Sequence, residues 1–140
     1  MTHPFVDTDV IIRLLTGDDQ EKQSASLTLF EQIESGAIAA IAPVTVIADA
    51  TYVLTSRAIG YLLPRSEVAD KLSALVRIPN FQVQNRRTVL DALSLYGTTN
   101  LDFGDCFIIT SMEESGSEIL YSWDRHYDRI PGIERREPQL

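Results

Sequence analysis

The spacing of apolar residues along the chain changes repeatedly between short runs of strand length and longer stretches of helical period. In residues 18–35, for example, Ala25, Leu29 and Ile33 share one face, an aspartate can cap the start, and Gly36 ends the stretch. The same reasoning predicts the other elements: helices over residues 9–17, 44–58, 65–77, 86–97 and 102–115, strands over residues 4–7, 37–42, 81–84 and 118–123, and a short helical turn with a last strand within 124–138.

Strands that are separated by helices pair in parallel through right-handed crossovers. The order of elements therefore predicts an α/β fold, a three-layer sandwich in which a short central parallel sheet carries helices on both faces. The helix over residues 86–97 is expected to close at Gly97. The helix over residues 102–115 is apolar nearly all round, so we expect it to be buried.

The composition fits one globular domain over residues 1–140. The hydrophobic content of 44% is sufficient for a core. No apolar run reaches the roughly 20 residues of a membrane span, and the first residues do not resemble a signal peptide. We therefore expect a cytoplasmic protein with no membrane partner, whose single cysteine, Cys106, is a small core residue. The net charge of −8 disfavours binding nucleic acid through Lys and Arg alone, although bound cations can reverse a local charge.

Two aspartates come at the ends of predicted strands. Asp7 ends the strand over residues 4–7, and Asp124 directly follows the strand over residues 118–123. Ligands of a parallel α/β sheet gather outside the carboxyl ends of its strands, so both carboxylates are expected at one mouth. A helix begins after each of them, and N-capping explains each aspartate equally well when it is taken alone.

Asp49 lies in the apolar stretch IADATYVL, with Val46, Ala50 and Val53 on or beside its helix face. A carboxylate buried there costs several kcal/mol unless a cation or hydrogen-bond donors satisfy it. The sequence therefore suggests a cation at Asp49. The alternative is a partly exposed Asp49 that a neighbouring arginine, such as Arg57, satisfies.

Asp102 and Asp105 are separated by the spacing of an N-cap and its third helical residue, so Asp102 is expected to cap the helix over residues 102–115. Asp105 then lies in the first turn, where the helix dipole favours an acid. This local explanation of Asp105 does not exclude a role in binding a metal.

Four aspartates at strand ends and on buried helices form an oxygen-only donor set, which suits a hard divalent cation such as Mg²⁺. A zinc site is excluded because the chain has too few of the usual zinc ligands, with two histidines and one cysteine. No Walker loop, dinucleotide-binding glycine motif or nucleophile elbow occurs. Acids with a metal on an α/β fold indicate metal-assisted hydrolysis of a phosphodiester.

Four segments in order resemble the motifs of VapC-type PIN domains: FVDTDVIIRLLTGDD, APVTVIADATYVL, LDFGDCFIITSMEESG and EILYSWDRHYDRIPGIERREP. The resemblance extends from Phe5 to Pro138 and makes residues 1–140 a single PIN-like domain. It implies an endoribonuclease that prefers single strands and depends on Mg²⁺ or Mn²⁺, usually the toxin of a toxin–antitoxin pair. The implied partners are an RNA substrate, a cognate antitoxin protein and a second subunit in a homodimer.

By motif position the resemblance assigns catalysis and metal binding to four acids. It adds three supporting residues. For Thr8, the alternative to a role in the site is helix capping. Asp102 is interpreted as the cap of the helix over residues 102–115. The acids are Asp7, Asp49, Asp105 and Asp124, and the supporting residues are Thr8, Asp102 and Ser122.

Two positions depart from the family pattern. Asp49 stands where the family usually has Glu, one methylene longer, and Asp9 stands where it usually has Asn. The first departure keeps open a catalytically weakened PIN fold that only binds a partner. A receiver-like signalling domain is a further alternative, which is disfavoured because Lys22 and Lys71, the two lysines, lie on polar helical stretches.

Overall fold

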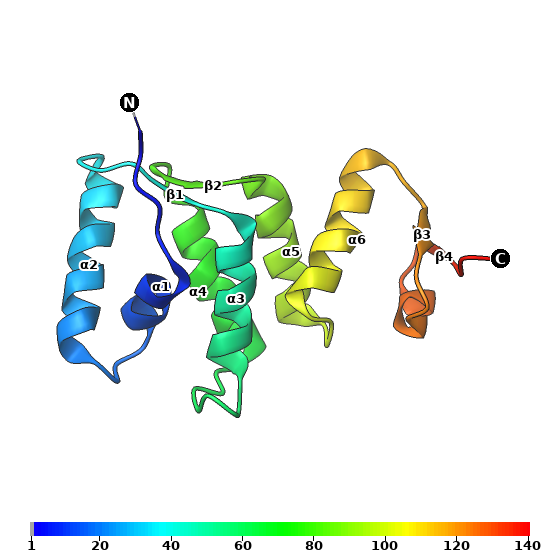
Figure 1. Cartoon of the computed structure of the whole chain (residues 1–140), viewed down its shortest axis with the longest axis horizontal. Helices are drawn as coiled ribbons and strands as arrows, with labels where there is room; N and C mark the ends of the chain where they lie inside the picture. Colours follow the sequence, from blue (N-terminus) through cyan, green and yellow to red (C-terminus); the bar gives the residue numbers. More distant parts are fainter. Residues whose placement is uncertain (1) are drawn as a thin grey trace.

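The computed structural model describes residues 2–140 (Figure 1). Six α-helices, four short strands and one 3-10 helix follow one another in these residues. Their bounds are α1 Thr8–Leu15, α2 Gln20–Ser35, β1 Ala40–Ala42, α3 Val44–Thr55, α4 Arg65–Val76, β2 Phe81–Val83, α5 Arg86–Thr98, α6 Phe103–Ser115, β3 Ile119–Tyr121, η1 Arg125–Arg129 and β4 Glu134–Arg136.

Side-chain caps and left-handed glycines set the helix ends that the sequence indicates. The Asp19 carboxylate accepts a hydrogen bond from the backbone N–H of Lys22 at 3.0 Å, and α2 ends at Gly36, whose φ is +87°. The Asp102 carboxylate accepts from the N–H of Asp105 at 2.9 Å, so the predicted cap of α6 is confirmed.

All strand pairing in residues 2–140 is parallel, which confirms the α/β class. β1 pairs with β2, and β3 pairs with β4. The segment before α1 adds to the other edge of β1, because the Val6 N–H donates to the Ile41 carbonyl at 2.9 Å and the Ile41 N–H donates to the Pro4 carbonyl at 2.8 Å. The two strand pairs are separate: in Figure 1 the β3–β4 pair lies beyond α6, away from β1.

The core lies between α1 to α5 and the β1–β2 pair, and α6 packs onto α5 at its edge (Figure 1). Cys106 is fully buried, as predicted, and burial raises the pKa of its thiol to about 11. The expectation that α6 is buried on all sides is wrong. Its Phe103, Cys106 and Ile109 are buried, but Ile108 on another side is 40% exposed.

The expectation that Gly97 ends its helix is also wrong, because α5 continues to Thr98. Gly97 is needed for packing instead. A Cβ built on Gly97 would lie 2.9 Å from the Cβ of Ala69 on α4, which is closer than real Cβ atoms approach. Gly97 therefore allows α4 and α5 to come together.

Replacing Gly97 with alanine is expected to destabilise the fold by about 1 to 3 kcal/mol, because the added methyl group overpacks the α4–α5 contact. Gly104→Ala is the matched control, since a Cβ there meets Asp102 Oδ1 at an ordinary 3.5 Å. Urea unfolding of the two variants measures the difference. Equal stability of both variants would contradict the packing role of Gly97.

Candidate acidic site

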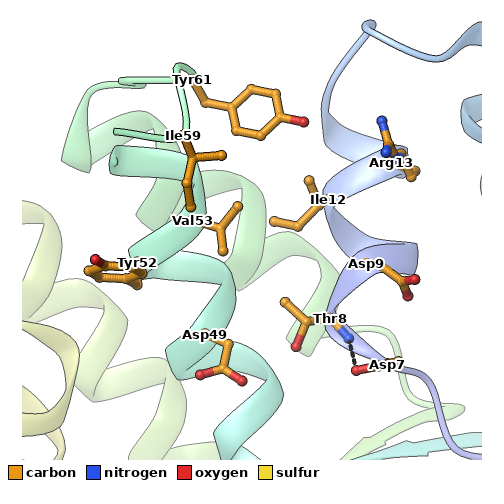
Figure 2. Close-up of a pocket in the computed structure, with 10 residues that line it drawn as sticks. All are labelled: Asp7, Thr8, Asp9, Ile12, Arg13, Asp49, Tyr52, Val53, Ile59 and Tyr61. Carbon is orange, nitrogen blue, oxygen red and sulfur yellow. Dashed lines mark hydrogen bonds between the residues drawn. The ribbon is translucent and has the colours of Figure 1, made fainter. Parts of the chain in front are cut away.

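The first acidic pocket lies between the start of α1 and α3 and has a volume of about 500 Å³. Figure 2 shows Asp49 of α3 on one side and Thr8 with Asp7 on the other, with apolar and aromatic side chains above them. Asp9 and Arg13 point away from α3 in this view, although both contribute to the lining.

Asp7 is held by its place in the chain. It follows the segment paired with β1 and caps α1, where its Oδ1 accepts a hydrogen bond from the Thr8 N–H at 2.7 Å (Figure 2). The capping explanation of Asp7 is thus correct as a local role. It engages one carboxylate oxygen, and the exposed side chain still faces the pocket.

The expectation of a costly apolar setting for Asp49 is wrong. Thr45, Asp49 and Tyr52 are spaced by four and three residues and form the exposed side of α3, whereas Val46 and Ala50 turn into the core. Solvent therefore satisfies the Asp49 carboxylate, and the case for Asp49 rests on its position in the pocket. No ion pair with Arg57 occurs within residues 2–140.

Asp18, which follows α1, connects the two sides of the rim of the first pocket. Its carboxylate accepts hydrogen bonds from the Tyr61 hydroxyl at 2.6 Å and the Thr16 hydroxyl at 2.9 Å, and it pairs with Arg13 at 3.2 Å. The Tyr61 hydrogen bond, helped by Thr16, lowers the pKa of Asp18. These contacts join the loop after α3 to the end of α1.

The second acidic pocket, also of about 500 Å³, lies between the start of α6 and η1. Asp102, Asp105 and Asp124 contribute carboxylates to it. Asp124 caps η1 by accepting from the His126 N–H at 3.2 Å, and the Ser122 hydroxyl in turn accepts from the Asp124 N–H at 3.0 Å. Ser122 therefore supports the loop that carries Asp124.

His126 is a site residue that the sequence analysis did not select. Its Nδ1 lies 2.6 Å from Oδ1 of Asp124, and its Nε2 lies 3.2 Å from Oδ2 of Asp105. The latter contact has the distance of an ion pair without the alignment of a hydrogen bond. The imidazole thus lies between the two acids, and its position two residues after Asp124 is the signal that could have identified it.

Tyr127 orients Asp105 through a hydrogen bond. Its side chain is buried, and its hydroxyl donates to Oδ1 of Asp105 at 2.8 Å. Burial and the neighbouring Asp105 carboxylate strongly raise the pKa of Tyr127. The phenol therefore remains a hydrogen-bond donor to Asp105 at any ordinary pH.

The structure brings the four predicted acids together in pairs: Asp7 with Asp49, and Asp105 with Asp124. Within residues 2–140, no three acidic, histidine or cysteine side chains surround a common point where a metal ion would sit. The donors themselves suit a hard cation, because Mg²⁺ keeps most of its waters and is commonly held by one or two carboxylates. Each aspartate pair provides two such carboxylates.

Two comparisons with known proteins bear on this site. The sequence matches the family model described as PIN domain over residues 5–133. It is also similar to a VapC ribonuclease of Aquifex aeolicus (strain VF5), with 21% identity over 126 residues that cover 90% of each chain.

Tyr127→Phe is expected to lower the free energy of unfolding by about 1 to 2 kcal/mol, because it removes the hydroxyl that Asp105 accepts from in a buried setting. Tyr52→Phe is the matched control, since Tyr52 is 69% exposed. Chemical unfolding monitored by circular dichroism measures both values. An equal effect of the two changes would show that the Tyr127 hydrogen bond does not hold the second pocket together.

Proposed function

Because the chain belongs to the PIN domain family, we propose that it is a metal-dependent endoribonuclease that hydrolyses RNA phosphodiester bonds. The observation that carries the proposal is the presence of an aspartate pair in each of two pockets, at the four positions that the family motifs assign. Its relative from Aquifex aeolicus is named a ribonuclease, which supports the same chemistry.

Asp7, Asp49, Asp105 and Asp124 are the residues that would hold Mg²⁺ or Mn²⁺. The bound ion would polarise a phosphodiester and lower the pKa of an attacking water. The protein's own contribution is to orient the acids: Asp7 through its cap of α1, Asp124 through Ser122, and Asp105 through the Tyr127 hydroxyl. Thr8 adds a hydroxyl to the pocket wall, and Asp102 acts as the cap of α6.

The first pocket offers features that suit single-stranded RNA. Tyr52 and Tyr61 line its upper part, and Tyr52 is 69% exposed, so an unpaired base can stack on it. Arg13 on the same rim is a candidate for a phosphate contact. Cations bound by the acids would offset the net charge of −8 at the RNA backbone.

The biological role that we propose is that of the toxin in a toxin–antitoxin pair, acting in the cytoplasm. The VapC name of the relative supports this role. The partner would be a cognate antitoxin that covers the acids with a basic side chain, since exposed carboxylates attract such a group. No helix in residues 2–140 is long and apolar enough to cross a membrane.

A PIN fold that only binds a partner is the second candidate. The observation that favours it is the separation of the acids into two pockets, because a pair alone provides fewer ligands than the full set. The receiver-like alternative loses support. Lys71 pairs with Glu67 on α4 at 3.3 Å and lines neither acidic pocket.

Purified protein is expected to cut single-stranded RNA in Mn²⁺ or Mg²⁺ and to stop when a chelator is added. Asp7→Asn and Asp105→Asn should each lower the cleavage rate by about a hundredfold or more. Removing a metal ligand costs more activity than removing a residue that only orients a ligand. Asp70→Asn, an exposed acid of α4, is the control. Cleavage that survives chelation or either change would contradict the mechanism, whereas an intact protein without activity would favour the binding-only candidate.

Asp49→Glu is expected to raise the cleavage rate and lower the metal concentration needed for half-maximal activity. Asp49 is exposed on α3, so the longer side chain has room and carries its carboxylate further into the pocket. Metal titrations of RNA cleavage compare the wild type with Asp49→Glu. Asp70→Glu, which adds the same methylene at an exposed acid of α4, is the control. A weaker response to metal in Asp49→Glu would show that the shorter arm is the one this site uses.

A further inference from the structure

We propose that Arg135 is a positioning residue of the ribonuclease site, which sets the place of Asp124 and of η1 beside Asp105. The inference rests on the proposed function for the role of the Asp124 carboxylate. Its structural basis is the set of contacts that the Arg135 guanidinium makes around the turn from β3 into η1, in a part of the chain that has little hydrophobic core.

The segment after α6 buries too little apolar surface to fix its own geometry. In residues 117–140, all of which the structure describes, Tyr127 is the one buried side chain, and β3 and β4 each alternate between exposed and half-buried residues. η1 is a 3-10 helix of five residues, and the hydrogen bonds of such helices have poor geometry. Hydrophobic packing alone therefore leaves the turn that carries Asp124 loosely placed, and polar contacts have to position it.

Arg135 supplies these polar contacts from the middle of β4. Its side chain is only 11% exposed. Nε and Nη2 donate to the two carboxylate oxygens of Asp128 in η1, at 2.8 and 3.4 Å. Nη1 donates to the Ser122 carbonyl after β3 at 2.9 Å, and to the Glu137 carboxylate at 2.8 Å. One guanidinium thereby joins β4, η1 and the residue that follows β3.

These contacts lie on both sides of Asp124 along the chain. Ser122 is two residues before it, and Asp128 is four residues after it. The N–H of Ser122 donates to the Arg136 carbonyl at 3.0 Å, and its carbonyl accepts from Arg135. The Ser122 hydroxyl accepts from the Asp124 N–H at 3.0 Å. Arg135 thus restrains both ends of the turn that presents the Asp124 carboxylate.

The same restraint extends to the other acid of the second pocket. His126 and Tyr127 come directly before Asp128 in η1, and both contact Asp105. His126 Nε2 lies 3.2 Å from Oδ2 of Asp105, and the Tyr127 hydroxyl donates to Oδ1 at 2.8 Å. By holding η1 through Asp128, Arg135 fixes the place from which these two side chains reach α6. The separation of the two acids in the second pocket therefore depends on this arginine.

The contact between Arg135 and Asp128 differs from an ordinary surface ion pair. Exposed pairs contribute little, because two flexible side chains must be ordered in water. Here the guanidinium is nearly buried, meets both carboxylate oxygens and bonds a carbonyl in addition. The contact raises the pKa of Arg135 and lowers the pKa of Asp128, so both stay charged at neutral pH. The neighbouring Arg136 is 49% exposed and pairs with Glu134 of the same strand, so that pair joins no two elements.

RNA cleavage by Arg135→Met tests the positioning. The kcat is expected to fall about 10- to 100-fold, which is the usual loss when a residue that orients a metal ligand is removed. The KM for RNA is expected to stay unchanged, because Arg135 lines neither acidic pocket. Arg136→Met is the matched control, since it removes the same charge from the next position of β4. Arg135→Lys should recover little of the rate, because one ammonium group cannot replace the planar fork that bonds Asp128 and Ser122 together.

Asp128→Ala shows whether Arg135 acts through Asp128. This change leaves the bond from Arg135 to the Ser122 carbonyl in place, so a smaller loss of kcat than in Arg135→Met is expected. The double variant should be no slower than Arg135→Met alone, because both changes open the same contact. Glu134→Ala with Arg136→Met is the control pair, and circular dichroism verifies the fold of each variant.

Trp123 provides a measurement that needs neither metal nor activity. It is the single tryptophan of the chain, it lies between Ser122 and Asp124, and its side chain is exposed. In the metal-free protein, time-resolved fluorescence anisotropy is expected to show a larger amplitude of fast local motion of Trp123 in Arg135→Met than in the wild type. Arg136→Met should match the wild type.

The outcomes separate this inference from the proposed function. A raised KM with unchanged kcat and a weaker salt dependence of RNA binding would show that Arg135 contacts a phosphate, which overturns the positioning role. Losses that multiply in the double variant, or equal effects of Arg135→Met and Arg136→Met, also overturn it.

Two further outcomes are decided by Trp123. If the wild type cuts no RNA, the ribonuclease function is refuted; increased Trp123 motion in Arg135→Met then supports the restraint of the turn, and unchanged motion overturns it. If Arg135→Met does not fold, Asp128→Ala takes its place. Reduced kcat with increased Trp123 motion in that variant supports the inference, and wild-type values of both overturn it.

Discussion

The packing of α6 against α5 is the constraint on which the arrangement of the acids depends. The buried Cys106 and the hydrogen bond from Thr88 to Glu114 hold α6 in place. α6 in turn carries Asp105 and, through the Tyr127 hydroxyl, the unit that contains β3 and η1. The position of the second aspartate pair is thus decided by helix packing outside the β1–β2 pair. In the first pair, Asp7 is positioned by the segment that β1 holds and Asp49 by α3.

Two of the arginines are used inside the fold. Arg65 donates to the carbonyls of Tyr96 and Leu101, and its guanidinium lies 3.7 Å from the centre of the Tyr96 ring. Arg86 donates to three carbonyls between α4 and α5. These two arginines hold the fold together and are not free for phosphates. In the proposed ribonuclease, cations held by the acids would add positive charge that these two arginines do not supply.

Local chemistry explains why the sequence predicted some site features well and others poorly. Caps depend on a few neighbouring residues, so Asp102 and the capping alternative for Asp7 were predictable. The exposure of Asp49 depends on which side of α3 meets the core, and its apolar neighbours gave a misleading impression of burial. His126 was missed although it lies two residues after Asp124, because its contact with Asp105 joins η1 to α6 and only that contact places the imidazole between the two acids.

Residue periodicity and capping were enough to determine the helices, the parallel α/β class and the placing of Asp7, Asp105 and Asp124 near strand ends or helix starts, because these properties depend on residues within one or two turns of the chain. The tertiary structure alone decided that Gly97 serves helix packing, and that the aspartates fall into two pairs. Both depend on which distant surfaces meet. That choice is made by the sum of many small packing contacts over the whole chain.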